Sequence, residues 1–145
     1  MDEIDMKILE VLKKDSRTSY KDIARETHIS DVAVHKRIKK LSNVIRAFTI
    51  LVDQKTMGED TTALLTIKCE VGKALEIAQR LSEVEDVREV YTTIGEYDII
   101  AKIKTENTET LKSVIEKELS QIKGLNEVRT SIVFECLKED VNLIF

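Results

Sequence analysis

The chain has 145 residues, of which 34% are charged and 42% are hydrophobic, and its formal net charge is −4. That length suffices for one ordinary domain or two small ones, and no apolar run approaches the roughly 20 residues that span a bilayer. The acidic start MDEIDMKIL lacks the basic segment of a secretory signal. We therefore expect a cytoplasmic protein with no membrane partner.

Charge is distributed unevenly along the chain. Residues 1–50 contain 11 Lys/Arg and 8 Asp/Glu, whereas the remaining 95 residues contain 12 and 19. Such asymmetry predicts that the first part meets a polyanion and the second does not. The pI of about 5.3 excludes a wholly basic nucleic-acid coat, but not a basic patch.

Residues 1–42 have the apolar spacing of three short helices. The first contains Ile4, Ile8, Val11 and Leu12 at helical intervals. Ser19 is placed to cap a second helix, whose apolar face is predicted to be Tyr20, Ile23 and Ala24. Ser30 is placed to cap a third, with Val34, Ile38 and Leu41 as its buried stripe.

The third predicted helix contains the basic segment HKRIKK at residues 35–40. A Lys/Arg cluster by itself is most often a solvated helix face. Here it follows two short helices and a tight break, which is the helix-turn-helix pattern, and its cations can displace counterions from DNA phosphates. We therefore predict binding to double-stranded DNA.

From about residue 44 the apolar period changes to that of strands. NVIRAFTILVD alternates like a strand that links two halves, and two β-α-β units follow. The units resemble each other, since EVYTTI at 89–94 matches EVRTSI at 127–132. A doubled β-α-β predicts an α+β chain with a ferredoxin-like second domain. The expected boundaries are 1–44 for the helix-turn-helix domain, 45–61 for a linker strand and hinge, and 62–145 for the βαββαβ domain.

The predicted sheet carries apolar residues on both faces, although helices cover only one. Leu65 and Ile67 alternate with Leu64, and Ala101 and Ile103 alternate with Ile100. The uncovered face therefore needs a partner, most simply a second copy of the chain in a two-fold homodimer. Such a dimer would place two recognition helices about one DNA turn (~34 Å) apart.

Metal and enzyme chemistry have little support in the sequence. Cys69 and Cys136 are isolated and lie on the apolar side of predicted strands, so both are expected in the core. Asp31 and His35 have i, i+4 spacing but no third ligand, so we expect no metal and no cofactor. No nucleophile–base pair or phosphate loop is visible, so no enzyme activity is expected.

The ordered motifs of the chain resemble those of the Lrp/AsnC (feast/famine) family of transcriptional regulators. They are IDMKILEVLKKDSRTSYKDIARE, HISDVAVHKRIKKL, VIRAF, TIGEYDIIAKI and VRTSIVFE, which together span nearly the whole chain. The resemblance implies sequence-specific DNA binding by dimers that assemble into tetramers or octamers. It also implies control by a small effector, commonly an amino acid, bound by the C-terminal domain.

The chain departs from the family pattern at two turns, where His28 and Asn43 stand in place of the usual glycines. If these positions take positive φ, His and Asn are among the better non-glycine choices. The segment KKLSNVI is also about two residues shorter than usual, which predicts either a shorter third helix or a tilted exit from it. Val32 and Ala33 replace small hydroxyl residues, and they could contact thymine methyl groups.

Candidate DNA contacts are polar, basic or small residues of the third helix and its flanks. Arg37 is the first candidate base reader, because a guanidinium can grip a guanine edge with two hydrogen bonds. Its alternative role is an ion pair with a glutamate of the same domain. The candidate set is Ser30, Val32, Ala33, His35, Lys36, Arg37, Lys39, Lys40 and Arg46, and the last three are expected to contact phosphates.

Candidate effector contacts follow from the position that GEYD occupies in the family. An amino acid needs acceptors for its ammonium group and donors for its carboxylate, and the candidates are Gly95, Glu96, Tyr97, Asp98 and Thr130. The same segment is also expected to form a hairpin turn, with Gly95 supplying an unusual dihedral. The competing hypothesis for the whole chain is an architectural, chromatin-like DNA-binding protein with no effector.

Overall fold

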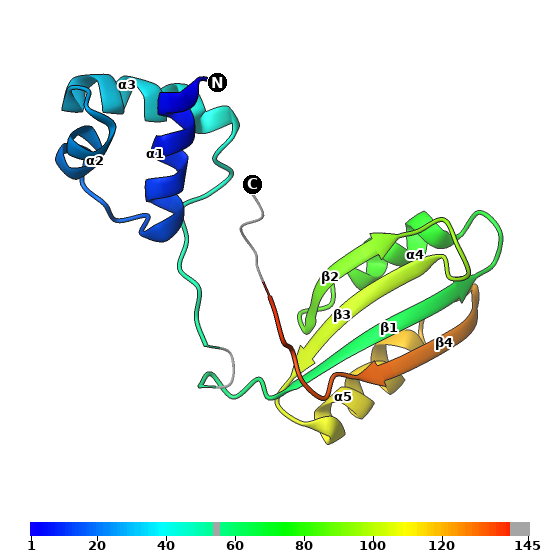
Figure 1. The fold of residues 1–145 in the computed structure, drawn as a ribbon. Coiled ribbons are helices and arrows are strands. Elements are labelled where there is room, and N and C mark those ends of the chain that lie inside the picture. The colour runs from blue at the N-terminus through cyan, green and yellow to red at the C-terminus, as the bar shows by residue number, and fades with distance from the viewer. Residues whose placement is uncertain (54–55, 140–145) are drawn as a thin grey trace. The chain divides into compact units, whose positions relative to one another are not determined.

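Residues 1–53 and 56–139 are described by the computed structural model, and they divide into two units, Met1–Leu51 and Val52–Glu139 (Figure 1). Each unit has its own cluster of buried apolar side chains. None of the described helices is long and apolar enough to cross a membrane.

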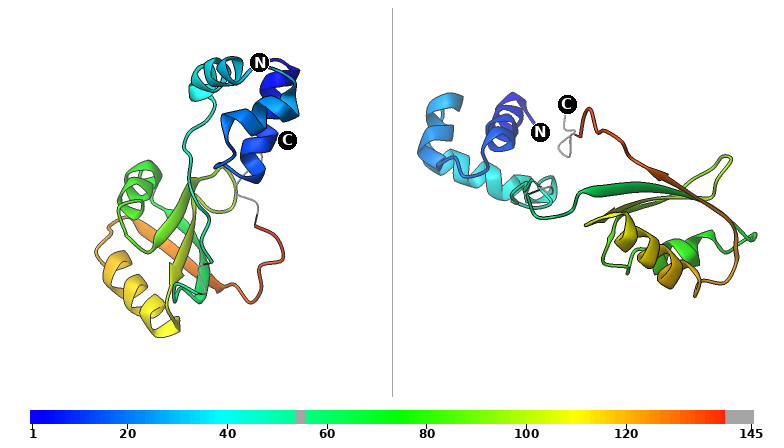
Figure 2. Two further views of the ribbon diagram at one scale, coloured as in Figure 1. Left: turned by 90° about the vertical axis from the view of Figure 1, so that its left-hand side faces the viewer. Right: turned by 90° about the horizontal axis from the view of Figure 1, so that it is seen from below.

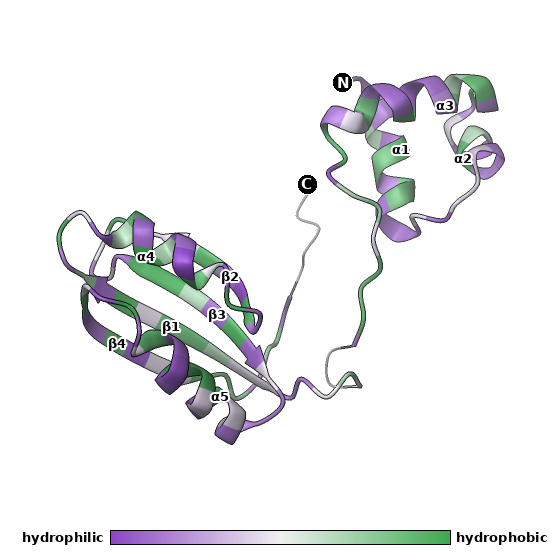
Figure 3. Cartoon of the chain, turned by 180° about the vertical axis from the view of Figure 1, so that it is seen from behind, coloured by the Kyte–Doolittle hydropathy of each residue, from purple (hydrophilic) through white to green (hydrophobic). Residues whose placement is uncertain are grey.

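The first unit contains three α-helices followed by a short 3₁₀ turn, as the apolar spacing predicts. The elements are α1 (Glu3–Lys14), α2 (Tyr20–Thr27), α3 (Asp31–Lys40) and η1 (Leu41–Asn43). Hydrophobic and hydrophilic residues alternate along α1 (Figure 3), and its apolar stripe packs on the other two helices. The buried cluster consists of Ile8, Leu9, Leu12, Ile23, Val34, Ile38 and Leu41.

Side-chain caps define where these helices begin. The Ser19 and Ser30 hydroxyls accept hydrogen bonds from the amides of Asp22 and Ala33, which confirms both predicted caps. Asp2 and Asp5 form a reciprocal capping box at the start of α1. The direction of each helix is therefore set locally by the sequence.

The turn between α2 and α3 contains one left-handed residue. His28 has φ 56° and ψ 36° and ends α2, so this position does take the positive φ that glycine usually supplies. Asn43 does not take positive φ and lies in the 3₁₀ turn. The prediction for Tyr20 was wrong, because its side chain is 42% exposed; it lies at the first position of α2, at the rim of the core.

The second unit is an antiparallel sheet of order β2-β3-β1-β4, which is the ferredoxin-like arrangement. Its strands are β1 (Thr61–Cys69), β2 (Val87–Thr92), β3 (Ile99–Thr105) and β4 (Leu125–Ile132). Its helices are α4 (Ala74–Leu81) and α5 (Thr108–Val114), and a π-helical turn η2 (Ile115–Leu119) continues α5. Both helices lie on one face of the sheet (Figure 2, right).

The strand residues that face the helices form the main core, which includes Leu65, Ile67 and Ala101. On the other face, Leu64, Tyr91 and Ile100 remain between 36% and 54% exposed. Val133, residues 135–139 and this open face together line a groove of about 500 Å³. The sheet therefore has one sealed face and one partly apolar face.

Three details of the second half differ from the sequence predictions. Residues 44–53 form no strand and are largely exposed, because no described strand pairs with them. The last strand ends at Ile132, so Cys136 lies beyond it and is exposed instead of buried. Cys69 is buried as expected, and burial raises the pKa of its thiol.

Candidate functional site

The exposed face of α3 is basic and is not neutralised by acidic neighbours. Lys36, Lys39 and Lys40 are exposed, and they form no ion pair with any residue in the described part of the chain. Val32 is on the same side and is 60% exposed. Packing of Val34 and Ile38 into the core fixes this orientation, so these cations can reach a phosphate backbone.

Arg37 is held inside the helical unit. Its Nη1 donates to both carboxylate oxygens of Asp2, at 2.9 and 2.7 Å, and to Oδ1 of Asp5 at 2.6 Å. The side chain of Asp5 is 6% exposed. The alternative role considered for Arg37, an ion pair within its domain, is therefore present, with two aspartates in place of a glutamate.

This cluster shifts the ionisation of all three groups. The Asp5 amide and the Arg37 guanidinium lower the pKa of Asp2, and the Asp2 amide and Arg37 lower the pKa of Asp5. The two carboxylates raise the pKa of Arg37. The cluster is thus a fully charged network at neutral pH.

The remaining DNA candidates surround the basic face. His35 is exposed, and its ring meets the Tyr20 ring edge-on with centroids 5.4 Å apart. Ser30 is exposed but its hydroxyl caps α3, and Ala33 is partly buried one turn later. Arg46 is exposed beyond η1. The structure therefore brings the candidates of α3 onto one surface, with His35 and Arg37 at its two edges.

The loop between β2 and β3 carries most of the effector candidates. Thr93 Oγ1 donates to the Tyr97 carbonyl at 2.6 Å, and the Thr93 amide donates to the Asp98 carbonyl. The Asp98 carboxylate accepts from the Cys69 amide at 2.7 Å, where β1 shifts its register. Gly95 does not take positive φ, so the role expected for it in the turn was wrong.

Two basic residues that the sequence reading missed lie beside Tyr97. Lys68 Nζ is 5.3 Å and Arg129 Cζ is 5.6 Å from the centre of its ring. Both also pair with Glu127, and Glu96 is exposed nearby in the loop. Alternation along β1 and β4 could have placed both cations on one sheet face, but their meeting with the loop depends on the register.

Thr130 is separated from this group. It lies opposite Leu65 in the sheet, so its side chain is on the helix-covered side, whereas Arg129 is on the open side. The structure therefore does not join Thr130 to the Tyr97 contacts.

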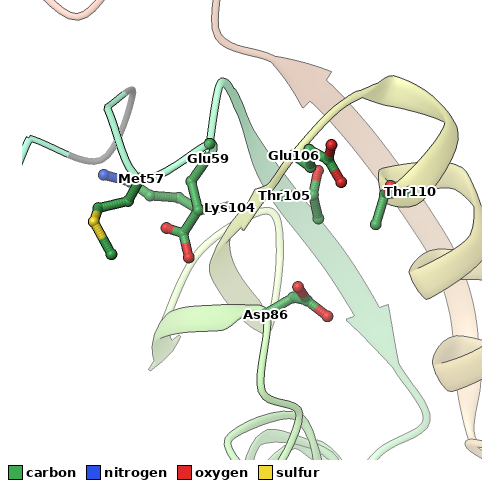
Figure 4. Close-up of a pocket in the computed structure, with 8 residues that line it drawn as sticks. Met57, Glu59, Asp86, Lys104, Thr105, Glu106 and Thr110 are labelled. Atoms are coloured by element: carbon green, nitrogen blue, oxygen red, sulfur yellow. The ribbon is translucent and has the colours of Figure 1, made fainter.

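A cavity of about 390 Å³ lies at the other end of the sheet (Figure 4). Glu59, Asp86, Lys104 and Glu106 are among its lining residues. None of the predicted effector residues lines this cavity or the groove on the open face. The GEYD loop thus lies outside both of these hollows, with Gly95 and Glu96 exposed and Tyr97 and Asp98 partly buried.

Comparisons with known proteins agree for both units. Residues 1–42 match the AsnC-type helix-turn-helix domain, and residues 62–143 match the Lrp/AsnC ligand binding domain. The HTH-type transcriptional regulator FL11 of Pyrococcus abyssi is 38% identical over 99% of this chain and 95% of its own length. LrpA of Pyrococcus horikoshii is 36% identical over 95% of this chain and 99% of its own length.

Solved structures share the whole fold. AsnC of E. coli superposes with a TM-score of 0.91 at 25% identity, covering 97% of this chain and 96% of that one. A regulator from Neisseria meningitidis, solved in complex with L-Met, has the same TM-score at 19% identity, covering 99% and 96%, and shows the fold alone. The chain has a DNA-binding helical unit and a ligand-binding unit, and it belongs to the Lrp/AsnC family of transcriptional regulators, which are not enzymes.

Proposed function

We propose that this chain is a sequence-specific regulator that binds double-stranded DNA through α3 and changes its binding in response to a small effector, most simply an amino acid. The observation that carries the proposal is the face of α3, where three exposed lysines have no acidic partner among the described residues. Such a face is suited to a polyanion, and the exposed Val32 on the same helix offers an apolar contact for a thymine methyl group. The same proposal places the chain in the cytoplasm, beside its DNA.

The effector proposal is supported by the chemistry around Tyr97. Lys68 and Arg129 share Glu127 as their acidic partner, and their remaining donors can receive a carboxylate. The Tyr97 ring can cover an apolar side chain, and exposed Glu96 can accept from an ammonium group. The Asp98 carboxylate is bound to the Cys69 amide, so we assign it to the support of the loop. The similar regulator from Neisseria meningitidis was solved in complex with L-Met, an amino acid with an apolar side chain.

Assembly is the second part of the proposal. Leu64, Tyr91 and Ile100 leave the open face of the sheet partly apolar. We propose that a second copy of the chain covers this face in a homodimer, and that dimers assemble further into a tetramer or an octamer. An effector bound at the exposed GEYD loop would then lie where neighbouring copies can complete its site.

The alternative is an architectural protein that binds DNA with little sequence preference. The lysine face supports that reading as well, since phosphate contacts carry no sequence information by themselves. A defined high-affinity site and a ligand response separate the two functions.

In vitro selection from random DNA tests the proposal, performed near physiological salt with and without pooled amino acids. A regulator should enrich a palindrome with half-sites about one turn apart, and its affinity should shift with one of the amino acids. Binding that is sensitive to salt but enriches no sequence would favour the architectural protein. No binding under either condition would contradict both.

A further inference from the structure

The side chains of α3 fall into three groups by direction. Val34 and Ile38 point into the core, and Val32, Lys36 and Lys39, spaced i, i+4 and i+7, occupy the opposite face. That opposite stripe is the part of the helix that projects furthest from its own unit. Residues between the two stripes are flanks, which neighbouring helices can reach.

Each flank of α3 is in contact with a different helix. On one flank the His35 ring packs edge-on against Tyr20 of α2. On the other, Arg37 joins Asp2 and Asp5 at the start of α1. These contacts resist rotation of α3 about its own axis, and the charged contact is the stronger of the two.

Arg37 is poorly suited to leave its position for a base. Asp5 is nearly buried, and its only cationic partner among the described residues is Arg37. Moving the guanidinium into a DNA groove would leave that carboxylate without its counter-charge, which is unfavourable for a group withdrawn from water. The capping box of α1 would also lose the cation that pairs with both of its carboxylates.

We propose that Arg37 is a positioning residue that fixes the rotation of α3 against α1, and that base discrimination belongs to the stripe of Val32, Lys36 and Lys39. This inference rests on the proposed DNA-binding function. It assigns the thymine methyl contact to Val32 and a guanine edge contact to Lys36, which can donate to O6 or N7 of that base.

The experiment compares Arg37→Gln with Lys36→Gln in the full-length chain. Both variants remove one formal positive charge from α3, so the net charge of the two proteins is the same. Affinity is measured for the site selected by the wild-type protein and for each of its single-base variants. Arg37→Gln should weaken binding to every sequence by a common factor, about tenfold if α3 is correctly oriented a tenth of the time. Lys36→Gln should instead flatten the preference at one base pair in each half-site.

Two further variants keep the test decisive if Arg37→Gln fails to fold. Arg37→Lys should restore part of the affinity, because a lysine can still pair with Asp5. Asp5→Asn keeps Arg37 but removes its buried partner, and it should leave the order of base preferences unchanged. A new or sharper preference in Asp5→Asn would show that the released arginine reads a base, and would overturn the proposal.

The outcomes also separate the two levels of inference. If Arg37→Gln flattens the preference at a defined base pair and Lys36→Gln does not, the positioning role is wrong while the proposed function stands. If the wild-type chain selects no sequence at all, the proposed sequence-specific function fails instead.

Discussion

The α3 surface and the β2–β3 loop both carry charged side chains, but these side chains have different partners in the fold. The lysines of α3 project from the fold without an acidic partner among the described residues, whereas the loop uses Asp98 and Thr93 to hold its own conformation. The difference follows from backbone demands. A helix satisfies its own amides, so its side chains are free to bind other molecules, while a turn and a strand irregularity recruit nearby oxygens.

The largest effect is expected from the α3 lysines. Replacing Lys36, Lys39 and Lys40 together with glutamine should lower DNA affinity about 100-fold near physiological salt and reduce the salt dependence of binding. Fluorescence anisotropy over a range of salt concentrations measures both. A matched variant of the ligand-binding unit, Lys112→Gln/Lys117→Gln/Lys123→Gln, should retain nearly all of the affinity. Equal losses in the two triple variants would show that only total charge matters.

The next effect concerns Asp98, which tests whether the β2–β3 loop uses its charged residues for its own stability. Asp98→Ala should destabilise the ligand-binding unit by about 1–3 kcal/mol, because the Cys69 amide loses its acceptor. Thermal unfolding followed by circular dichroism measures the loss, and Glu96→Ala is the control that should leave the melting temperature unchanged. A stable Asp98→Ala protein would mean that another group satisfies this amide. Because of this supporting role, a lost effector response in Asp98→Ala alone would not identify a ligand contact.

Glu96 is the better probe of the effector. Glu96→Gln keeps the shape of the loop and removes the acceptor charge, so it should weaken the binding of an amino acid about tenfold. Isothermal titration with the amino acid recovered from the selection experiment measures the affinity. Glu106→Gln, at the opposite end of the sheet, is the matched control. If only the control weakened binding, the effector site would move to the cavity that Glu106 lines.

The smallest effect concerns pH. The folded protein lowers the pKa of Asp2 and Asp5, so an unfolded chain binds more protons than the folded one as the pH approaches the usual aspartate value. The stabilisation should be complete at neutral pH and should be lost as the pH falls below about 4. Melting temperatures of the wild type and of Asp2→Asn/Asp5→Asn are compared at neutral and at acid pH. Asparagine can still cap α1, so the variant should fold. Because it lacks both carboxylates, it should lose less stability in acid than the wild type.

Much of this architecture could be read from the sequence because it depends on local patterns. Ser19 and Ser30 predict helix starts, and the repeated EVYTTI and EVRTSI segments predict the doubled β-α-β. The partners of Arg37 could not be read, because they lie 35 and 32 residues away and depend on the packing of α1 against α3. Residues 44–53 show the converse, since their alternation predicts a strand but no described strand pairs with them.

The position of β1 at the centre of the sheet also bears on the order in which the chain folds. β1 pairs with β3 and with β4, so its second neighbour comes from the end of the sheet region, some sixty residues later in the sequence. The helical unit, by contrast, closes its core within the first 45 residues. Local contacts form faster than distant ones. During synthesis the DNA-binding unit can therefore fold before β4 is available to pair with β1. In that interval the apolar residues of the incomplete sheet are exposed to other chains.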